Sequence, residues 1–339
     1  MTPTKLRVAL IGAGGISAAH AKGALLHPDK LEYVALCDVS AENLQKRKAQ
    51  LGTEPALFSD WKALFAEFGD NFDAVDICLP HHLHTAAILD AVAAGKHILC
   101  EKPLCIDLAE ADKIVDAVRA AGITFMPGHN QLFLPIVREA RRMIDAGMIG
   151  PVRWLRSIDV FKNIWLGAND WRFTKKIQGG GELIDTGYHP TYRLMYLAGS
   201  EFVGVRASMG RYFLPMEGED SASVQVRFAN GAVGEIMSSW AYAAPYGAHQ
   251  IHVIGDGGQI FGTGDNLYYL PEGFKEPAHR VLPGSVDTFA AQAEYFSRCV
   301  LTGERPLHSV EESRTVLQII LGASADAEGW EQYAAKKLA

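Results

Sequence analysis

Short apolar runs alternate with segments of helical composition through the first third of the chain. Gly52, Gly95 and Gly122 each follow a helical segment, a position where glycine commonly ends a helix. Strands that alternate with helices of about 10–15 residues are typical of βαβ units. The pattern therefore predicts an α/β, doubly wound parallel sheet, with strands Arg7–Ile11, Tyr33–Cys37, Ala74–Leu79 and His97–Cys100 and helices Ser17–Leu26, Ala41–Leu51, Trp61–Phe68, Ala86–Ala94 and Leu108–Ala121.

The pattern changes after about residue 126. Val224, Val226 and Phe228 alternate with polar residues, a period of two that is typical of a strand with one buried face. The dipeptide Asn230-Gly231 that follows is a strong hairpin signal. The predicted elements of this part are helix Pro135–Ala146, strands Ser223–Phe228, Val233–Trp240, Gln250–Ile254 and Gln259–Phe261, and closing helices Val286–Leu301 and Glu311–Ala323.

These patterns predict two domains, residues 1–126 and 127–339, as a length of 339 residues also suggests. The second is expected to be an α+β domain with a large open, mainly antiparallel sheet. An open sheet has two faces to cover, so we expect self-association through the free face, into a homodimer or homotetramer.

Composition narrows the class of protein. Hydrophobic residues make up 48% of the chain and charged residues 21%, which allows a large core and excludes global disorder. The net charge of −7 and the lack of a basic stripe argue against a nucleic-acid partner. No apolar run approaches the roughly 18 residues of a membrane span, and the short run after Met1 flows into a glycine-rich turn, so we expect a cytoplasmic protein with no membrane partner. The five cysteines lack a CxxC spacing and are interpreted as buried structural thiols.

A glycine-rich turn follows the first predicted strand and opens the first predicted helix. It contains Gly12, Gly14, Gly15 and Ile16, and it fits the dinucleotide fingerprint G-x-G-x-x-G/A except at Ser17, the third position. Gly12 allows the tight turn, Gly14 allows the backbone to approach a pyrophosphate, and the helix N-terminus offers N–H groups to it. The segment therefore predicts a dinucleotide site.

Asp38 ends the second predicted strand, where an acidic residue can accept hydrogen bonds from a ribose 2′-hydroxyl and would repel a 2′-phosphate. Val39 and Ser40 follow it, and no arginine does. We therefore expect NAD as the cofactor, with NADP less favoured. The alternative is that Asp38 merely caps the next helix.

Two further segments lie just past predicted parallel strands, where ligands of such sheets bind. They are Leu79-Pro80-His81-His82-Leu83-His84 and Cys100-Glu101-Lys102-Pro103. The histidines of the first could suggest zinc, but no cysteine or carboxylate set completes a tetrahedral site, so no metal is predicted. A third segment, Gly179-Gly180-Gly181 through Asp185 to His189, lies in the second predicted domain.

Together these segments resemble the glucose–fructose oxidoreductase / inositol dehydrogenase / rhizopine catabolism (Gfo/Idh/MocA) family. The glycine turn, the stretch Ala94–Leu104 and the GGG…D…H segment have the family's order and spacing, and the resemblance covers nearly the whole chain. It implies a Rossmann domain, a sugar or cyclitol substrate, and transfer of a hydride between a secondary alcohol and nicotinamide.

The resemblance also implies roles for individual residues. Lys102 would touch nicotinamide and the reacting hydroxyl, His189 would act as acid/base, and Asp185 would complete the catalytic set. The implied cofactor contacts are Gly12, Gly14, Gly15, Ile16, Asp38, Leu79, Pro80, His81, His84, Glu101, Lys102, Trp171 and Arg172, and the implied substrate contacts are Lys102, Asn130, Arg172, Asp185 and His189. The chain departs from the family at His81, where asparagine is common, and at Leu132-Phe133, where many members have arginine.

The residue types suit alcohol oxidation independently of the resemblance. A histidine titrates near neutral pH and can take the hydroxyl proton as hydride leaves carbon. A lysine cation stabilises the developing alkoxide. Asp185 could orient the imidazole or bind another hydroxyl, and it would share a face with His189 if one helix held both, with Pro190 in a first turn or at a kink.

Two other functions remain open. One is redox-neutral glycoside cleavage with tightly held NAD on the same scaffold. The other is a non-catalytic dinucleotide sensor, which would need the glycine turn but neither Lys102 nor His189. Trp154, Phe161, Trp165 and Trp240 could line a sugar-binding face, although core packing is favoured for most of them.

Overall fold

The computed structural model describes residues 5–167, 170–282, 284 and 286–338, with side chains described as far as residue 329. The described residues form two compact units. One holds residues up to Asn130 together with Val286–Arg314, and the other holds the remaining residues. The first unit therefore includes a returning C-terminal segment, which the boundary at residue 126 placed in the second domain.

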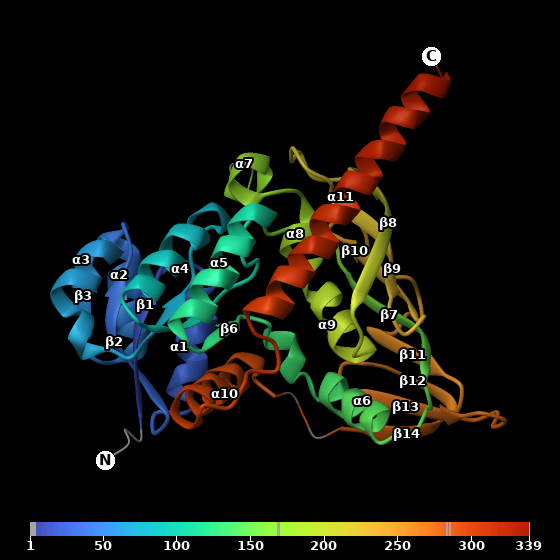
Figure 1. Ribbon diagram of the computed structural model, residues 1–339, viewed down its shortest axis with the longest axis horizontal. Helices are drawn as coiled ribbons and strands as arrows, with labels where there is room; N and C mark the ends of the chain where they lie inside the picture. Colours follow the sequence, from blue (N-terminus) through green and yellow to red (C-terminus); the bar gives the residue numbers. More distant parts are fainter. Residues whose placement is uncertain (1–4, 168–169, 283, 285, 339) are drawn as a thin grey trace. The chain divides into compact units, whose positions relative to one another are not determined.

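The sheet of the first unit is parallel throughout its described strands, in the order β3-β2-β1-β4-β5-β6 (Figure 1). This order reverses direction between β1 and β4 and confirms the predicted doubly wound sheet. Two short strands, β3 and β6, were not predicted. The strands are β1 (Leu6–Ile11), β2 (Leu31–Cys37), β3 (Ala56–Phe58), β4 (Ala74–Ile77), β5 (His97–Cys100) and β6 (Phe125–Pro127).

Two helices of this unit, Ala41–Leu51 and Leu108–Ala121, begin at polar caps and end at the glycines that the sequence predicts. The Ser40 hydroxyl accepts the Asn43 N–H and an Asp107 carboxylate oxygen accepts the Glu110 N–H, while Gly52 and Gly122 end two helices at positive φ. The helical segments are α1 (Ser17–Leu25), α2 (Ala41–Leu51), α3 (Trp61–Phe68), η1 (Gly69–Asn71), η2 (His81–Leu83), α4 (His84–Ala93), α5 (Leu108–Ala121) and the returning α10 (Thr288–Thr302).

Helix α10 packs against α1. A Cβ on Gly23 of α1 would lie 2.6 Å from the backbone carbon of Phe289, so only glycine allows this approach. The returning helix is therefore an integral part of the nucleotide-binding unit rather than an appendage to it.

The second unit contains a mainly antiparallel sheet of eight described strands, in the order β14-β13-β12-β11-β7-β10-β9-β8. Its one parallel pair among these strands joins β7 to β10. Both predicted hairpins are present, since β9 pairs with β10 and β11 with β12. The strands are β7 (Val152–Val160), β8 (Phe202–Gly210), β9 (Ser221–Phe228), β10 (Val233–Ser239), β11 (Ile251–Gly255), β12 (Gly258–Thr263), β13 (Asn266–Pro271) and β14 (Ala278–Val281).

Helix α9 packs against β7 and β10 at the middle of this sheet (Figure 1). Its side chains Tyr188, Tyr192 and Leu194 are fully buried and form part of the core. The helical segments of the chain outside the first unit are α6 (Pro135–Asp145), η4 (Trp171–Phe173), α7 (Lys175–Gln178), α8 (Glu182–Asp185) and α9 (Tyr188–Ala198), while η3 (Asn130–Phe133) and α11 (Val310–Leu338) each span a boundary between the units.

Candidate active site

The glycine turn lies at the carboxyl end of β1, as predicted. Gly12 has a φ of +95°, and a Cβ there would lie 2.4 Å from the carbonyl oxygen of Cys78. Gly14 and Gly15 have no atom within 4 Å of the position a Cβ would take. The first glycine is therefore required by the fold, whereas the next two leave open space above the turn.

The substitution of Ser17 for glycine or alanine at the third motif position adds a hydrogen bond. Ser17 is fully buried, and its hydroxyl donates to the carbonyl of Gly14 at 2.6 Å. Arg47 of α2 donates to the same carbonyl at 3.0 Å and to the Ser17 hydroxyl at 3.1 Å. These bonds hold the carbonyl of the turn inward, and no side chain caps the N-terminus of α1. The N–H groups of the helix start thus stay suited to an anionic ligand.

Asp38 links the end of β2 to the glycine turn. One carboxylate oxygen accepts the Ala13 N–H at 2.7 Å, and the other accepts the Ser40 N–H at 2.7 Å. The alternative that Asp38 caps α2 is wrong, because Ser40 occupies the cap position. Each carboxylate oxygen has two lone-pair sites, so the hydrogen bonds present leave capacity for ribose hydroxyls.

The segment after β4 folds into η2 and the start of α4. His84 is buried, and its two ring nitrogens lie 2.7 Å from the carbonyl of Pro103 and 2.9 Å from that of Leu79. Burial lowers the pKa of His84, and the two carbonyls oppose that effect. His84 therefore ties the Leu79-Pro80 strand end to the turn that carries Lys102. His81 is buried with its ring centroid 6.0 Å from that of His84. The predicted cofactor contacts of this segment stay predictions.

Lys102 lies in a turn at the carboxyl end of β5, and a cis peptide bond joins it to Pro103. The backbone N–H of Lys102 donates to a carboxylate oxygen of Glu101 at 3.2 Å. Since β1, β4 and β5 are adjacent parallel strands, the glycine turn, Leu79-Pro80 and Lys102 all lie at the same edge of one sheet. The structure thus brings together the first-unit residues that the sequence singled out.

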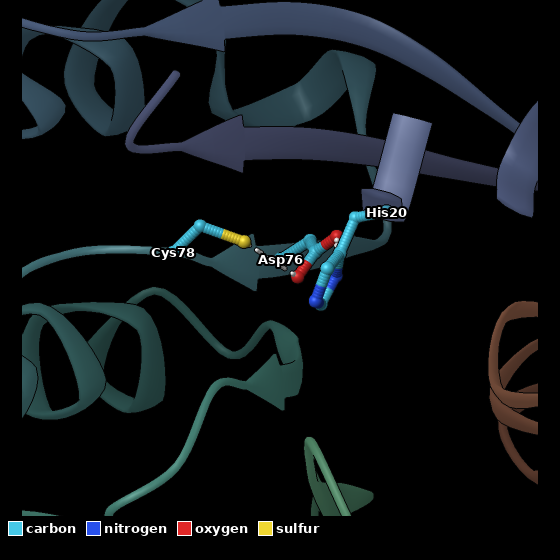
Figure 2. Close-up of side chains that lie close together, drawn as sticks. All are labelled: His20, Asp76 and Cys78. Carbon is cyan, nitrogen blue, oxygen red and sulfur yellow. Dashed lines mark hydrogen bonds and ion pairs between the residues drawn. The ribbon is translucent and has the colours of Figure 1, made fainter. Parts of the chain in front are cut away.

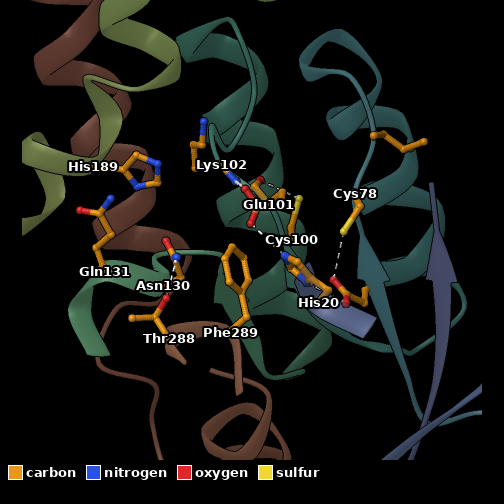
Figure 3. A network of polar contacts seen from close by, with 12 residues as sticks. His20, Cys78, Cys100, Glu101, Lys102, Asn130, Gln131, His189, Thr288 and Phe289 are labelled. Carbon is orange, nitrogen blue, oxygen red and sulfur yellow. Dashed lines mark hydrogen bonds and ion pairs between the residues drawn. The ribbon is translucent and has the colours of Figure 1, made fainter. Parts of the chain in front are cut away.

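Sequence reasoning missed a buried polar network beneath this edge. His20 of α1 is 2% exposed, and its ring nitrogens lie 2.9 Å from Asp76 on β4 and 2.9 Å from Glu101 (Figures 2 and 3). The Tyr33 hydroxyl donates to the same Asp76 oxygen as His20 at 2.5 Å. The signal that could have revealed it is Asp76, a carboxylate within an otherwise apolar strand.

Asn130 is the predicted substrate contact at the end of the first segment of the first unit. Its side-chain amide donates to the Thr288 hydroxyl at 3.0 Å, at the start of α10 (Figure 3). The side chain is thereby oriented by the returning segment. Its predicted contact with substrate stays a prediction.

In the second unit, Arg172 and Asp185 form an ion pair. The Arg172 Nε donates to Asp185 at 2.8 Å, a second guanidinium nitrogen donates to Asp170 at 3.2 Å, and the guanidinium lies 4.5 Å from the centre of the Trp171 ring. Burial alone would lower the pKa of Arg172, but Asp185 and Asp170 raise it. The pair couples two predicted site residues that are thirteen positions apart in the chain.

His189 is part of α9, whereas Asp185 ends α8, so one continuous helix does not hold both residues. The condition on which a shared helix face was predicted is therefore not met, because the chain turns at Thr186 and Gly187. Pro190 lies in the first turn of α9, as expected. The His189 Nδ1 lies 2.7 Å from the Tyr192 hydroxyl, which also accepts the Gln131 N–H at 3.0 Å. These contacts fix the orientation of the imidazole.

Among the candidate aromatic residues, Trp240 belongs to the core. It is 2% exposed, packs with Phe173 and Met216, and donates from its indole N–H to the Thr186 hydroxyl at 2.8 Å. Trp165 is 74% exposed and contacts Phe161, with 5.5 Å between ring centroids. Core packing is thus confirmed for Trp240 but not for Trp165.

The residues of the first unit fit NAD. Gly14 and Gly15 leave space where a Cβ would intrude, the start of α1 has no side-chain cap, and Asp38 is anchored beside the turn. A bound pyrophosphate would be held by the backbone of residues 14–17, and the ribose by Asp38. No cation accompanies Asp38 in the hydrogen bonds described above, which suits an unphosphorylated ribose.

A doubly wound sheet with this turn defines a dinucleotide-binding Rossmann domain. Comparison with known families is consistent with this class: the description "Oxidoreductase family, NAD-binding Rossmann fold" matches residues 6–129, and "GFO/IDH/MocA C-terminal domain" matches residues 137–261. The chain belongs to the GFO/IDH/MocA oxidoreductase family.

Individual relatives agree with this assignment. The chain is 28% identical to myo-inositol 2-dehydrogenase of Thermotoga maritima, over 94% of this chain and 95% of the relative. It is 30% identical to 1,5-anhydro-D-fructose reductase of Ensifer adhaerens, over 76% and 75% of the two chains. A solved structure of levoglucosan dehydrogenase with NADH and levoglucosan is 25% identical, with a TM-score of 0.85 over 96% of this chain and 98% of that one.

Among the described residues, no helix combines the length and the apolar character that crossing a membrane requires.

Proposed function

We propose that this protein oxidises a secondary alcohol of a sugar, sugar derivative or cyclitol, or reduces the corresponding ketone. The observation that carries the proposal is the shared sheet edge: the turn of Lys102 lies at the same edge as the glycine turn and Asp38, with the end of β4 between them. The printed names of the relatives, which act on inositol, anhydrofructose and levoglucosan, support a polyhydroxylated substrate.

In the proposed oxidation the alcohol loses two hydrogens: one leaves the carbinol carbon as a hydride, and the other leaves the hydroxyl oxygen as a proton. When bound, NAD accepts a hydride from the carbinol carbon. Lys102 hydrogen-bonds to the hydroxyl oxygen and stabilises the negative charge that develops there as the C–H bond breaks. His189 takes the hydroxyl proton, so that a ketone forms and the charges balance. In the reverse direction His189 returns that proton.

The second-unit contacts support the role of His189. The Tyr192 hydroxyl holds Nδ1, which fixes the plane of the ring. Asp185 and Arg172 form a charged pair of polar groups that is suited to hydrogen-bonding further hydroxyls of a sugar or cyclitol. The Glu182 side chain, in the same short helix as Asp185, is fully buried, and burial raises its pKa well above the usual range. Glu182 also accepts a hydrogen bond from the Ser238 hydroxyl, so we assign it a structural role rather than that of proton acceptor.

A panel of polyols, aldoses and cyclitols tests the proposal, with NAD and NADP measured in parallel at 340 nm. On the best substrate, Lys102→Ala is expected to lower kcat by about 10²–10³-fold and His189→Ala by about 10²–10⁴-fold. Lys113→Ala and His279→Ala are matched controls, since both residues are exposed and lie in the same respective units. No reduction of either cofactor by any substrate would contradict the proposal, and glycoside cleavage without net NADH would favour the redox-neutral alternative.

We further propose that the protein acts as a homodimer or homotetramer, with the strands of the second unit at the interface. A groove of about 710 Å³ crosses β7–β10, and Arg156, Arg206 and Glu235 line it together with fully exposed Tyr246. Opposite charges within one patch suit a two-fold contact with a second copy. Light scattering that shows a strict monomer would reject this proposal.

A cytoplasmic location is part of the proposal as well. All five cysteines are free and buried, which suits a reducing compartment. Fractionation of the native cells tests it.

A further inference from the structure

His20 joins two carboxylates in the interior of the first unit. Its Nδ1 lies 2.9 Å from Asp76 and its Nε2 lies 2.9 Å from Glu101, and all three side chains are buried (Figure 3). A histidine bridging two carboxylates can donate from both nitrogens only as an imidazolium. A buried arrangement of one cation and two anions is costly unless each member is hydrogen-bonded, as each is here.

Glu101 is the member of this network that reaches the candidate active site. One of its oxygens faces His20, and the other accepts the N–H of Lys102 at 3.2 Å. Gly128 provides the space for this side chain, because a Cβ there would lie 2.8 Å from the Glu101 oxygen that His20 contacts. The Glu101 carboxylate therefore has little freedom to move away from the Lys102 backbone.

We propose that His20 is a positioning residue for Lys102: by holding the Glu101 carboxylate from the core side, it fixes the turn that carries the lysine. The inference rests on the proposed role of Lys102 at the reacting hydroxyl. His20 itself lies beneath the edge of the sheet, and it acts only through Glu101.

The surroundings of His20 favour its charged form. Burial alone would lower the pKa of His20, but Asp76 and Cys78 raise it well above the usual range. The groups that face the ring are Asp76 from β4, Cys78 just after β4, Glu101 just after β5, and the ring of Phe289 from α10, whose centroid is 5.2 Å away. Tyr33 of β2 is bonded to Asp76. Phe289 closes the apolar side of the pocket and limits rotation of the imidazole.

The same donors could be taken for a metal site, since ligand atoms of His20, Asp76 and Cys78 lie within 4.8 Å of one another (Figure 2). The hydrogen bonds argue for the ion-pair interpretation. Both nitrogens of His20 face carboxylates, and the Tyr33 hydroxyl bonds the same Asp76 oxygen as His20 does. Burial also raises the pKa of the Cys78 thiol to about 12, which disfavours the thiolate that binds metals.

Two amide substitutions separate the two halves of the network. In His20→Gln the side-chain amide reaches about as far as Nε2 and can still donate to Glu101, whereas in His20→Asn it reaches only as far as Nδ1 and can donate to Asp76. Both variants remove the charge, so their stabilities should fall together. His308→Asn serves as a control, because it alters another buried histidine of the same unit.

We expect kcat per folded molecule to fall by about 10²-fold in His20→Asn, the loss that a displacement of about 1 Å produces at a reacting centre. In His20→Gln kcat should stay within about tenfold of the parent protein. If the two variants lose activity equally, or if neither loses activity per folded molecule, His20 has only a structural role and the proposal is overturned.

A second readout is independent of turnover. In the protein without substrate, the Lys102 amide resonance in a ¹H–¹⁵N NMR spectrum should shift and exchange faster in His20→Asn, but should stay near its parent position in His20→Gln. An unchanged Lys102 amide in His20→Asn would overturn the inference. Lys102→Ala with full activity would instead overturn the proposed function while leaving this amide measurement interpretable, so the two failures are distinguishable.

Discussion

The addition of one methyl group should have different effects at Gly12 and at Gly14: it should lower the stability of the fold at Gly12 and the affinity for NAD at Gly14. In Gly12→Ala the new Cβ would lie 2.4 Å from the Cys78 carbonyl oxygen, on a backbone whose φ is +95°. An L-residue in a left-handed conformation costs about 1–2 kcal/mol, and overpacking of a rigid core costs a further 1–3 kcal/mol. Gly12→Ala should therefore destabilise the protein by about 2–5 kcal/mol, a large part of the roughly 5–15 kcal/mol that stabilises a typical domain.

Gly14→Ala is the matched variant, because its Cβ would meet no atom within 4 Å. Its urea unfolding curve, followed by circular dichroism, should overlay that of the parent protein. The added methyl group would instead occupy the space predicted for the pyrophosphate, so the Kd for NAD should rise at least about tenfold, equivalent to about 1.4 kcal/mol. A Gly14→Ala protein with unchanged stability and an unchanged Kd, measured by calorimetry, would refute the placement of the dinucleotide at this turn.

Three further changes test other parts of the first unit. Asp38→Asn removes the charge that repels a 2′-phosphate, so the ratio of kcat/KM for NADP to that for NAD should rise about tenfold or more; an unchanged ratio would count against the ribose contact. Because the folded-state pKa of His20 is raised, its stabilising contribution is present in full below pH ~6.5 and is lost as pH rises through the elevated value. The difference in unfolding free energy between the parent protein and His20→Gln should therefore become smaller at alkaline pH. Urea curves between pH 5 and 10, a range around the usual pKa of about 6.5, measure this difference, and an increase at alkaline pH would contradict the assignment. Ser40→Ala removes the cap of α2 and should cost about 1 kcal/mol, seen as a melting temperature about 2–4 °C lower.

The sequence predicted the nucleotide-binding sheet well because each of its signals was local. Gly52 and Gly122 end their helices at positive φ, as expected, and Leu108–Ala121 is helical over the predicted residues. The apolar run at Val8–Ile11 could be recognised without knowledge of its neighbours, since a parallel strand buried on both faces has a nearly continuous run of apolar residues.

The central strand β7 was not predicted, because polar residues occupy some of its buried positions. Ser157 is fully buried beside Arg193, whose guanidinium is buried too and donates to the Ser157 hydroxyl at 3.1 Å. A polar residue at a core position breaks the period of two from which strands are predicted. Strands β8 and β14 lie at the sheet edges and bury few side chains, so their sequences carry little alternation.

The candidate site was predicted where motifs are continuous in sequence and missed where contacts are distant. The turn Glu101-Lys102-Pro103 could be predicted from three consecutive residues, whereas the bond from His20 to Glu101 joins residues 81 positions apart. The separation of Asp185 and His189 into two helices follows from the turn at Gly187, where a Cβ would lie 2.7 Å from Leu183. Spacing by four residues alone does not distinguish that turn from a continuous helix.

The return of Val286–Arg314 to the first unit has a consequence for anyone who wishes to isolate a minimal cofactor-binding module. A fragment that stops at residue 130 would lack Phe289, so the ring of His20 would lose this contact and the surface of α1 at Gly23 would be exposed to water. A spliced gene that joins residues 5–130 to 286–314 through a short flexible linker would retain both contacts of α1 with α10.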